Sequence, residues 1–227
     1  MSRAEHRAGG ACAIAGSALL FLGTYLHPLG ADPNDARAAF AEYAADHLWV
    51  TSHLTQLAGV VLMVAAILLV TRRLETAGGN AWARLTAAAA VASLALAAAL
   101  QAVDGVALKR MVDAWAAAPA SEQDAAFRAA FAVRQLESGL AAMASLFLGV
   151  TSTLAGLALR ADRDHPGWLG AIALLGGIPT MVAGVVLAYT GFSEAAMWIN
   201  MPANLVLLVW MLLLGGFMWR RAEAGAR

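Results

Sequence analysis

Six long apolar runs constrain this chain more than any other feature, because each can cross a bilayer as a helix. A helix rises about 1.5 Å per residue and the hydrocarbon core is about 30 Å thick, so about 20 apolar residues suffice. The predicted spans are Gly10–His27, Leu48–Val70, Leu85–Leu108, Leu136–Leu159, Leu169–Tyr189 and Met197–Trp219. The runs are continuous rather than alternating, which excludes a barrel. The sequence therefore predicts an all-α, polytopic transmembrane helix bundle with six spans.

The composition agrees with this fold class. Only 13% of the 227 residues are charged and 61% are hydrophobic, whereas soluble domains carry about 25% charged residues. No soluble domain or internal repeat is recognisable, so a single transmembrane domain over residues 1–227 is predicted. The N-terminus resembles a signal peptide, but no small-x-small cleavage site follows Pro28, so this segment is expected to remain as the first helix.

The basic residues are distributed unevenly and predict the orientation. With the N-terminus inside, the inner segments hold ten of the fifteen basic residues, namely Arg3, Arg7, Arg72, Arg73, Arg84, Arg160, Arg163, Arg220, Arg221 and Arg227. The positive-inside rule then predicts both termini in the cytoplasm (N-in/C-in), with the chain in the cytoplasmic (inner) membrane. The tryptophans expected at the outer interface are Trp49, Trp115 and Trp198, and those at the inner one are Trp82, Trp168 and Trp219.

Two short helices are predicted on the outer surface. The segment 32–35 (Asp-Pro-Asn-Asp) is typical of a turn and a helix cap, and Phe40 and Tyr43 follow on an amphipathic stretch. Before the fourth span, Ser121-x-x-Asp124 resembles a capping box, and Phe127 lies one turn before another phenylalanine. A second surface helix is therefore expected there, separate from the span.

Polar side chains in the spans are few, and most lie within about two turns of the predicted outer surface. On the second span, Asp46 and His53 are seven residues apart and are predicted to share a face, with Gln56 one turn further. The first span ends at His27, directly before Pro28. In a bundle these helix ends converge, which predicts one pocket open to the outer side. Its expected lining is His27, His53, Gln56, Gln101, Asp104 and Glu137, with Arg134, Tyr189 and Asn200 as further substrate contacts.

These residue types favour metal or acid–base chemistry. The predicted metal ligands are His27, His53, Asp104 and Glu137, since two imidazoles and a carboxylate suit zinc or another divalent ion and leave a position for water. The predicted catalytic groups are His53, Asp104 and Glu137. A metal-free site is the other enzymatic hypothesis, in which a protonated carboxyl donates to a lipid-like substrate, as in integral-membrane terpene cyclases.

Two hypotheses from other classes stay open. A single haem b held by His27 and His53 would make the chain an electron-transfer or sensor subunit. A structural network of Asp104, Glu137 and Arg134 would suit a non-catalytic partner or a transporter subunit. The expected partners are the lipid bilayer and an amphiphilic small molecule, with no nucleic acid.

The sequence lacks the motifs of several known enzyme classes. There is no GxSxG, Walker or HExxH motif. Cys12 is the only cysteine, which excludes structural disulfides and a dithiol relay.

Three segments carry a family resemblance: YAADHLWVTSHLTQLAG from residue 43, LQAVDGVALKRMVDAW from residue 100 and AYTGFS from residue 188. They resemble a group of uncharacterised six-helix integral membrane proteins of high-GC bacteria. The similarity extends over most of the chain. It implies the six-helix fold and transfers no activity.

Overall fold

The computed structural model describes residues 2–28, 30–76 and 80–224 of the chain. Its elements are α1 (Arg3–Leu26), α2 (Ala36–Ala45), α3 (Trp49–Thr76), α4 (Ala81–Gln101), the π-helix η1 (Ala102–Leu108), α5 (Lys109–Ala117), α6 (Gln123–Ala161), α7 (Gly167–Thr190) and α8 (Glu194–Ala224). Part of the predicted inner loop, residues 77–79, and Arg227 lie outside the described residues.

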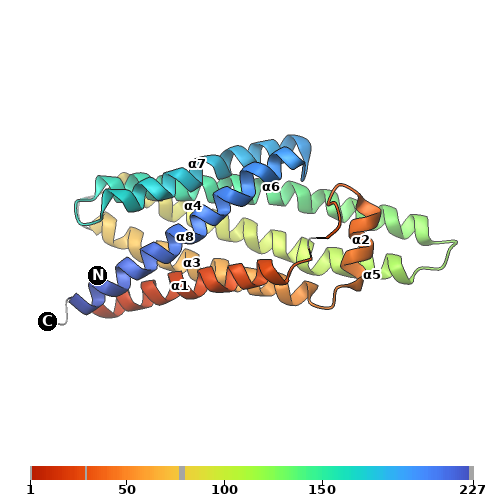
Figure 1. Cartoon of the computed structure of the whole chain (residues 1–227), viewed down its shortest axis with the longest axis horizontal. Helices are drawn as coiled ribbons and strands as arrows, with labels where there is room; N and C mark the ends of the chain where they lie inside the picture. The colour runs from red at the N-terminus through yellow and green to blue at the C-terminus, as the bar shows by residue number, and fades with distance from the viewer. Residues whose placement is uncertain (1, 29, 77–79, 225–227) are drawn as a thin grey trace.

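In the described part of the chain, six helices are long and apolar enough to cross a membrane, which confirms the predicted class. They are Arg3–Leu26, Trp49–Glu75, Ala81–Ala117, Gln123–Ala161, Gly167–Thr190 and Glu194–Ala224. The protein is therefore a multi-pass membrane protein. Figure 1 shows the long helices side by side, with both termini at one end of the bundle and α2 lying across it near the other. These two ends are called the terminal end and the α2 end below.

Glycines allow the long helices to approach closely. A Cβ atom added at Gly149 of α6 would lie 2.4 Å from the backbone nitrogen of Met181 on α7. A Cβ added at Gly23 of α1 would lie 2.6 Å from the carbonyl oxygen of Ser52 on α3. Such backbone contact is typical of membrane helices, whose association depends on van der Waals packing. The contact at Gly23 brings the end of α1 against the start of α3.

One predicted surface helix is confirmed and the other is wrong. The side chain of Asp35 accepts hydrogen bonds from the backbone nitrogens of Arg37 and Ala38, both at 3.1 Å, and so caps α2 as expected. By contrast, α6 is continuous from Gln123 to Ala161 and its N-cap is Glu122, without a side-chain cap. The residues between 124 and 136 include many strong helix formers and no proline or glycine, so nothing separates a surface helix from the span.

The start of the second span also differs from the prediction. Asp46 is the C-cap of α2, with φ −82° and ψ 114°, and its carboxylate accepts a hydrogen bond from the Leu48 nitrogen at 2.8 Å. This extended turn means that Asp46 and His53 do not share a helix. Trp49, expected at the interface, is only 1% exposed. Its indole nitrogen donates to the Asp104 carbonyl at 3.0 Å, so Trp49 packs inside the bundle.

Candidate functional site

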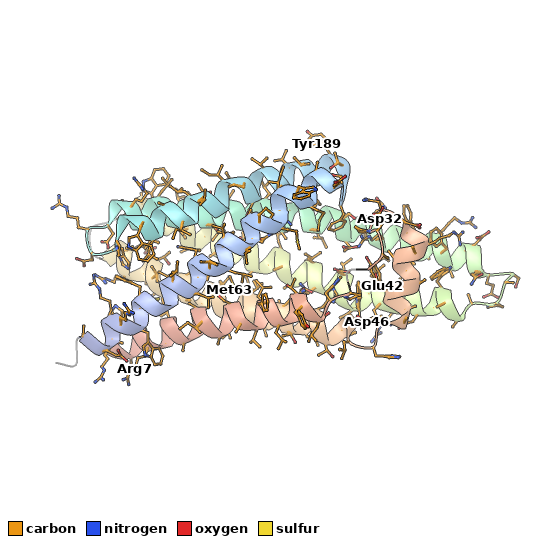
Figure 2. All side chains as sticks on the ribbon, viewed as in Figure 1. Arg7, Asp32, Glu42, Asp46, Met63 and Tyr189 are labelled. Carbon is orange, nitrogen blue, oxygen red and sulfur yellow. The ribbon has the colours of Figure 1, made fainter. Side chains whose placement is uncertain are left out.

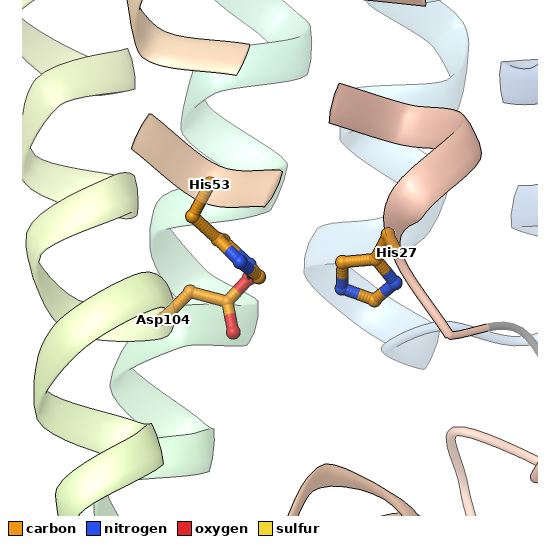
Figure 3. A group of neighbouring side chains, drawn as sticks. All are labelled: His27, His53 and Asp104. Carbon is orange, nitrogen blue, oxygen red and sulfur yellow. Dashed lines mark hydrogen bonds and ion pairs between the residues drawn. The ribbon is translucent and has the colours of Figure 1, made fainter. Parts of the chain in front are cut away.

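Three of the residues predicted from the sequence lie together at the α2 end. His27, His53 and Asp104 each offer a ligand atom, and these atoms all lie within 4.8 Å of one another. His27 caps the C-terminus of α1, His53 lies in the second turn of α3, and Asp104 belongs to η1. Figure 3 shows the ring of His53 against the carboxylate of Asp104, with the ring of His27 to one side of both. The three residues are called the His-His-Asp cluster.

His53 is oriented by the backbone of its own helix. Its Nδ1 lies 2.7 Å from the Trp49 carbonyl oxygen, and since a carbonyl only accepts, Nδ1 carries the proton. Its Nε2 lies 3.0 Å from Oδ2 of Asp104. In the neutral ring Nε2 presents a lone pair, and a lone pair facing a carboxylate oxygen needs a positive centre between them, either a proton or a metal ion.

His27 is held in the same tautomer. Its Nδ1 lies 2.7 Å from the Pro28 carbonyl oxygen, which leaves Nε2 without the proton in the neutral ring. The ring packs 4.7 Å from the ring of Trp49 and 5.1 Å from that of His53, measured between centroids. Burial lowers the pKa of His27, and the nearby His53 lowers it further, against the opposite influence of Asp104. His27 is therefore neutral at pH 7, the form that binds metals.

Asp104 lies in a segment whose geometry the sequence pattern did not predict. Residues Ala102–Leu108 form a π-helix between α4 and α5. Such wide turns inside α-helices are rare and occur often at functional sites. A Cβ added at the next residue, Gly105, would lie 2.5 Å from Cβ of His53. A glycine directly after an intramembrane aspartate was the one available signal that this turn contacts another helix closely.

Gly105→Ala is expected to destabilise the protein by about 1–3 kcal/mol, because the added methyl group must displace His53 or the π-turn. The expected change in stability is opposite in sign to the effect of helix propensity alone, which favours alanine over glycine by about 1 kcal/mol. Thermal unfolding of the purified protein in detergent measures it. Gly139→Ala is the matched control, since no atom lies within 4 Å of a Cβ added there. Equal melting temperatures for the two variants would contradict the tight contact.

Two acceptors on the same helix face lack a donor. Gln101 donates to Oε1 of Gln56 at 3.1 Å, as a pair between α4 and α3. Oε1 of Gln101 and Oδ1 of Asp104 are buried and have no hydrogen-bond partner among the described residues. Buried polar atoms are normally satisfied, so two neighbouring unpaired acceptors call for a group that brings positive charge or donors.

Glu137 lies in an ion pair and is not part of the His-His-Asp cluster. Its carboxylate is bound by the Arg134 guanidinium one turn earlier on α6, and the two side chains are 3% and 8% exposed. Arg134 also donates to the Pro33 carbonyl oxygen at 3.2 Å, and its guanidinium lies 4.7 Å from the ring centre of Phe192. The pair thus joins α6 to the segment before α2 and to the turn after α7.

α2 is anchored over the cluster by its own Glu42 and by Lys109 of α5. The Glu42 carboxylate accepts hydrogen bonds from the backbone nitrogens of Gly30 and Ala31, at 2.8 and 2.9 Å. Lys109 donates to the carbonyl of Tyr43 at 3.0 Å, near the C-terminus of α2, where a cation is favourable. The Tyr43 ring packs 4.2 Å from that of Trp49, and burial raises the pKa of Tyr43 to about 12, which keeps the phenol neutral.

Two predicted substrate contacts do not join the cluster. Tyr189, near the end of α7, is 87% exposed and points away from the bundle in Figure 2. Asn200 accepts a hydrogen bond from Asn204, one turn along α8, at 2.8 Å. An aromatic residue at the end of a span is typical of the membrane interface, which explains the exposure of Tyr189.

Comparisons with known proteins identify a family without an assigned activity. The family model described as Domain of unknown function (DUF4386) matches residues 8–216. No curated protein and no solved structure matches the chain. The match includes all three residues of the His-His-Asp cluster, and it agrees with the resemblance to uncharacterised membrane proteins. The chain belongs to the family of the domain of unknown function DUF4386.

Proposed function

We propose that the protein binds one divalent transition-metal ion, with zinc the best fit, through His27, His53 and Asp104, and acts with it on an amphiphilic substrate at the outer end of the bundle. One observation carries this proposal: ligand atoms from two imidazoles and one carboxylate lie within 4.8 Å of one another inside a membrane bundle. Ionisable groups at such depth are costly, so their gathering at one point favours a function.

The distances fit a metal site after a small movement. Zinc bonds of about 2.0–2.1 Å at tetrahedral angles place neighbouring ligand atoms about 3.3 Å apart. The separation of 3.0 Å between His53 Nε2 and Asp104 Oδ2 is already close to this value. The widest separation, up to 4.8 Å, requires one ligand to move inward. His27 can supply that movement, since it caps α1 in an extended conformation rather than lying within a helix.

The surroundings of both histidines also favour a metal ion. Metal-binding histidines almost always donate their other ring N–H to a carbonyl or carboxylate, which fixes the tautomer and orients the ring. Both rings have this arrangement, with Nδ1 at 2.7 Å from a backbone carbonyl oxygen. The unpaired Oδ1 of Asp104 leaves room for two-point binding by the carboxylate.

The ligand set limits the chemistry. Three protein ligands leave at least one position open, as in catalytic zinc sites. A bound ion lowers the pKa of a coordinated water to about 7 and so supplies a nucleophile at neutral pH. Iron(II) also uses two histidines and one carboxylate, so the same ligands suit an oxygenase site. Elemental analysis decides between the two metals.

The geometry supports a metal ion rather than haem b. The two imidazole rings pack on each other with centroids 5.1 Å apart, and His53 Nε2 faces Asp104. A porphyrin needs its two axial imidazoles on opposite faces with the macrocycle between them. The described side chains at the cluster, including Trp49 and Tyr43, fill the space that a macrocycle would require.

Metal content of the full-length protein tests the proposal. After equilibration with zinc and removal of the excess, the detergent-purified chain is expected to retain about one zinc per chain. Asp104→Asn and His27→Ala are expected to retain almost none. His47→Ala is the control, since His47 is exposed at the same end of the bundle. Equal metal content in all four proteins, or none in the wild type, would refute the proposed site.

A further inference from the structure

We propose that a groove between α1 and α8 at the terminal end binds one anionic phospholipid, with an acyl chain along its floor and the phosphate on Arg220. The groove has a volume of about 570 Å³. Its floor consists of Ala11, Ile14 and Ala15 from α1 and Gly216 from α8. This inference is independent of the metal site, which lies at the opposite end of α1.

The groove is created by the way the two helices cross. A Cβ added at Gly10 would lie 2.9 Å from the Gly215 carbonyl oxygen, so the backbones touch at this level. At the next residue, Gly216, an added Cβ would meet no atom within 4 Å. The helices therefore make contact on one side of α8 and leave an open channel beside it. Two of the floor residues on α1, Ala11 and Ala15, have small side chains that keep this channel wide.

The chemistry of the rim selects a charged head group. Trp219 and Arg220 border the groove where α8 leaves the apolar region. Tryptophan and arginine at this level are typical anchors at the membrane interface. Arg220 is exposed and forms no ion pair with another residue in the described part of the chain. Glu223 also borders the groove. The flanking segments 3–7 and 220–223 nevertheless carry four arginines against two glutamates, so the net charge at this end of the groove is positive.

The size favours a lipid over a second copy of the chain. A helix about 10 Å wide with a pitch of 5.4 Å fills about 400–500 Å³ per turn, so the groove holds roughly one turn of a helix. One turn is a small contact for a stable helix pair. A flexible acyl chain can follow the whole floor instead. Because the floor faces hydrocarbon, lipid is also the ligand present at the highest concentration.

Native mass spectrometry of the full-length protein tests the proposal. Phosphatidylglycerol is expected to bind about fivefold more tightly than phosphatidylcholine, the factor that one cation near the surface contributes. Arg220→Gln is expected to remove this preference. Gly216→Leu fills the channel and is expected to weaken binding of both lipids by at least about fivefold. Gly139→Leu is the matched control, because Gly139 is an exposed helical glycine that, like Gly216, has open space for a Cβ.

Each alternative outcome has a clear meaning. Equal binding of phosphatidylglycerol by the wild type and Gly216→Leu would overturn the proposal. A wild-type dimer that Gly216→Leu converts to monomer would also overturn it and would assign the groove to a second copy of the chain. Unchanged melting temperatures for Gly216→Leu and Gly139→Leu would show that the loss of lipid is not caused by unfolding.

Discussion

His53→Ala is expected to lower the affinity for zinc by at least about 100-fold. Losing a residue that only hydrogen-bonds to a ligand costs up to about 100-fold in metal affinity, and losing the ligand itself should cost at least as much. The substitution removes the nitrogen that lies 3.0 Å from Asp104. His27 and Asp104 would remain as two ligands, and two ligands do not form a stable tetrahedral site. Competition with a chelator of known zinc affinity, in detergent solution, measures the change.

A second variant, Asp104→Asn, separates a loss of zinc binding from a loss of stability. His53 is only 2% exposed, so its truncation also leaves a cavity in the bundle. Asp104→Asn keeps the shape of the side chain while removing the ligand charge, and its zinc affinity is expected to fall by a similar factor. The exposed His47 supplies the control, His47→Ala, with an affinity like that of the wild type. A wild-type affinity in Asp104→Asn would remove the carboxylate from the proposed ligand set.

Arg134→Met is expected to destabilise the protein by about 3–5 kcal/mol, because it leaves the Glu137 carboxylate buried without its partner. Both side chains are almost fully buried, so water cannot replace the lost interaction. The variant also loses the hydrogen bond to the Pro33 carbonyl oxygen, which helps to hold the segment before α2. Reversible unfolding in mixed micelles measures the free energy of unfolding.

A double variant shows whether the loss of stability comes from losing the ion pair itself or from leaving one charge buried without its partner. Replacing both charges, as in Arg134→Met with Glu137→Leu, is expected to restore most of the stability, since apolar pairs often replace buried ion pairs at little cost. Arg37→Met is the control for an exposed pair: Arg37 and Asp124 are 59% and 79% exposed, and such pairs contribute within about 1 kcal/mol. A loss below about 1 kcal/mol in Arg134→Met would contradict the buried pair.

Prediction from the sequence was most successful where one property acts over a whole segment. Each span is a long apolar run, and in lipid only a helix satisfies its backbone, so the six spans followed from length and hydropathy. The cap at Asp35 was also predictable, because a cap depends on its own chain neighbours. The separate surface helix expected after Ser121 was wrong: the chain breaks between Ala117 and Gln123, but the residues that follow favour one uninterrupted helix.

The candidate site was only partly predictable. The sequence marked His27, His53 and Asp104 as unusual, because polar groups in spans are costly. It did not separate them from Glu137, which lies in the ion pair with Arg134. Whether a polar residue joins the cluster depends on its contacts with side chains from helices that are far apart in the sequence. The spacing of residues within one helix does not contain this information.

The sequence by itself determined the number of spans and the class of fold, because a long apolar segment in lipid satisfies its backbone hydrogen bonds only as a helix. Only the tertiary structure decided that Trp49 is buried, that the chain around Asp104 forms a π-turn, and that two histidines meet one aspartate. These features arise from close contact between helices, such as Gly105 against His53. Each contact depends on packing of several segments at once, which no single stretch of sequence specifies.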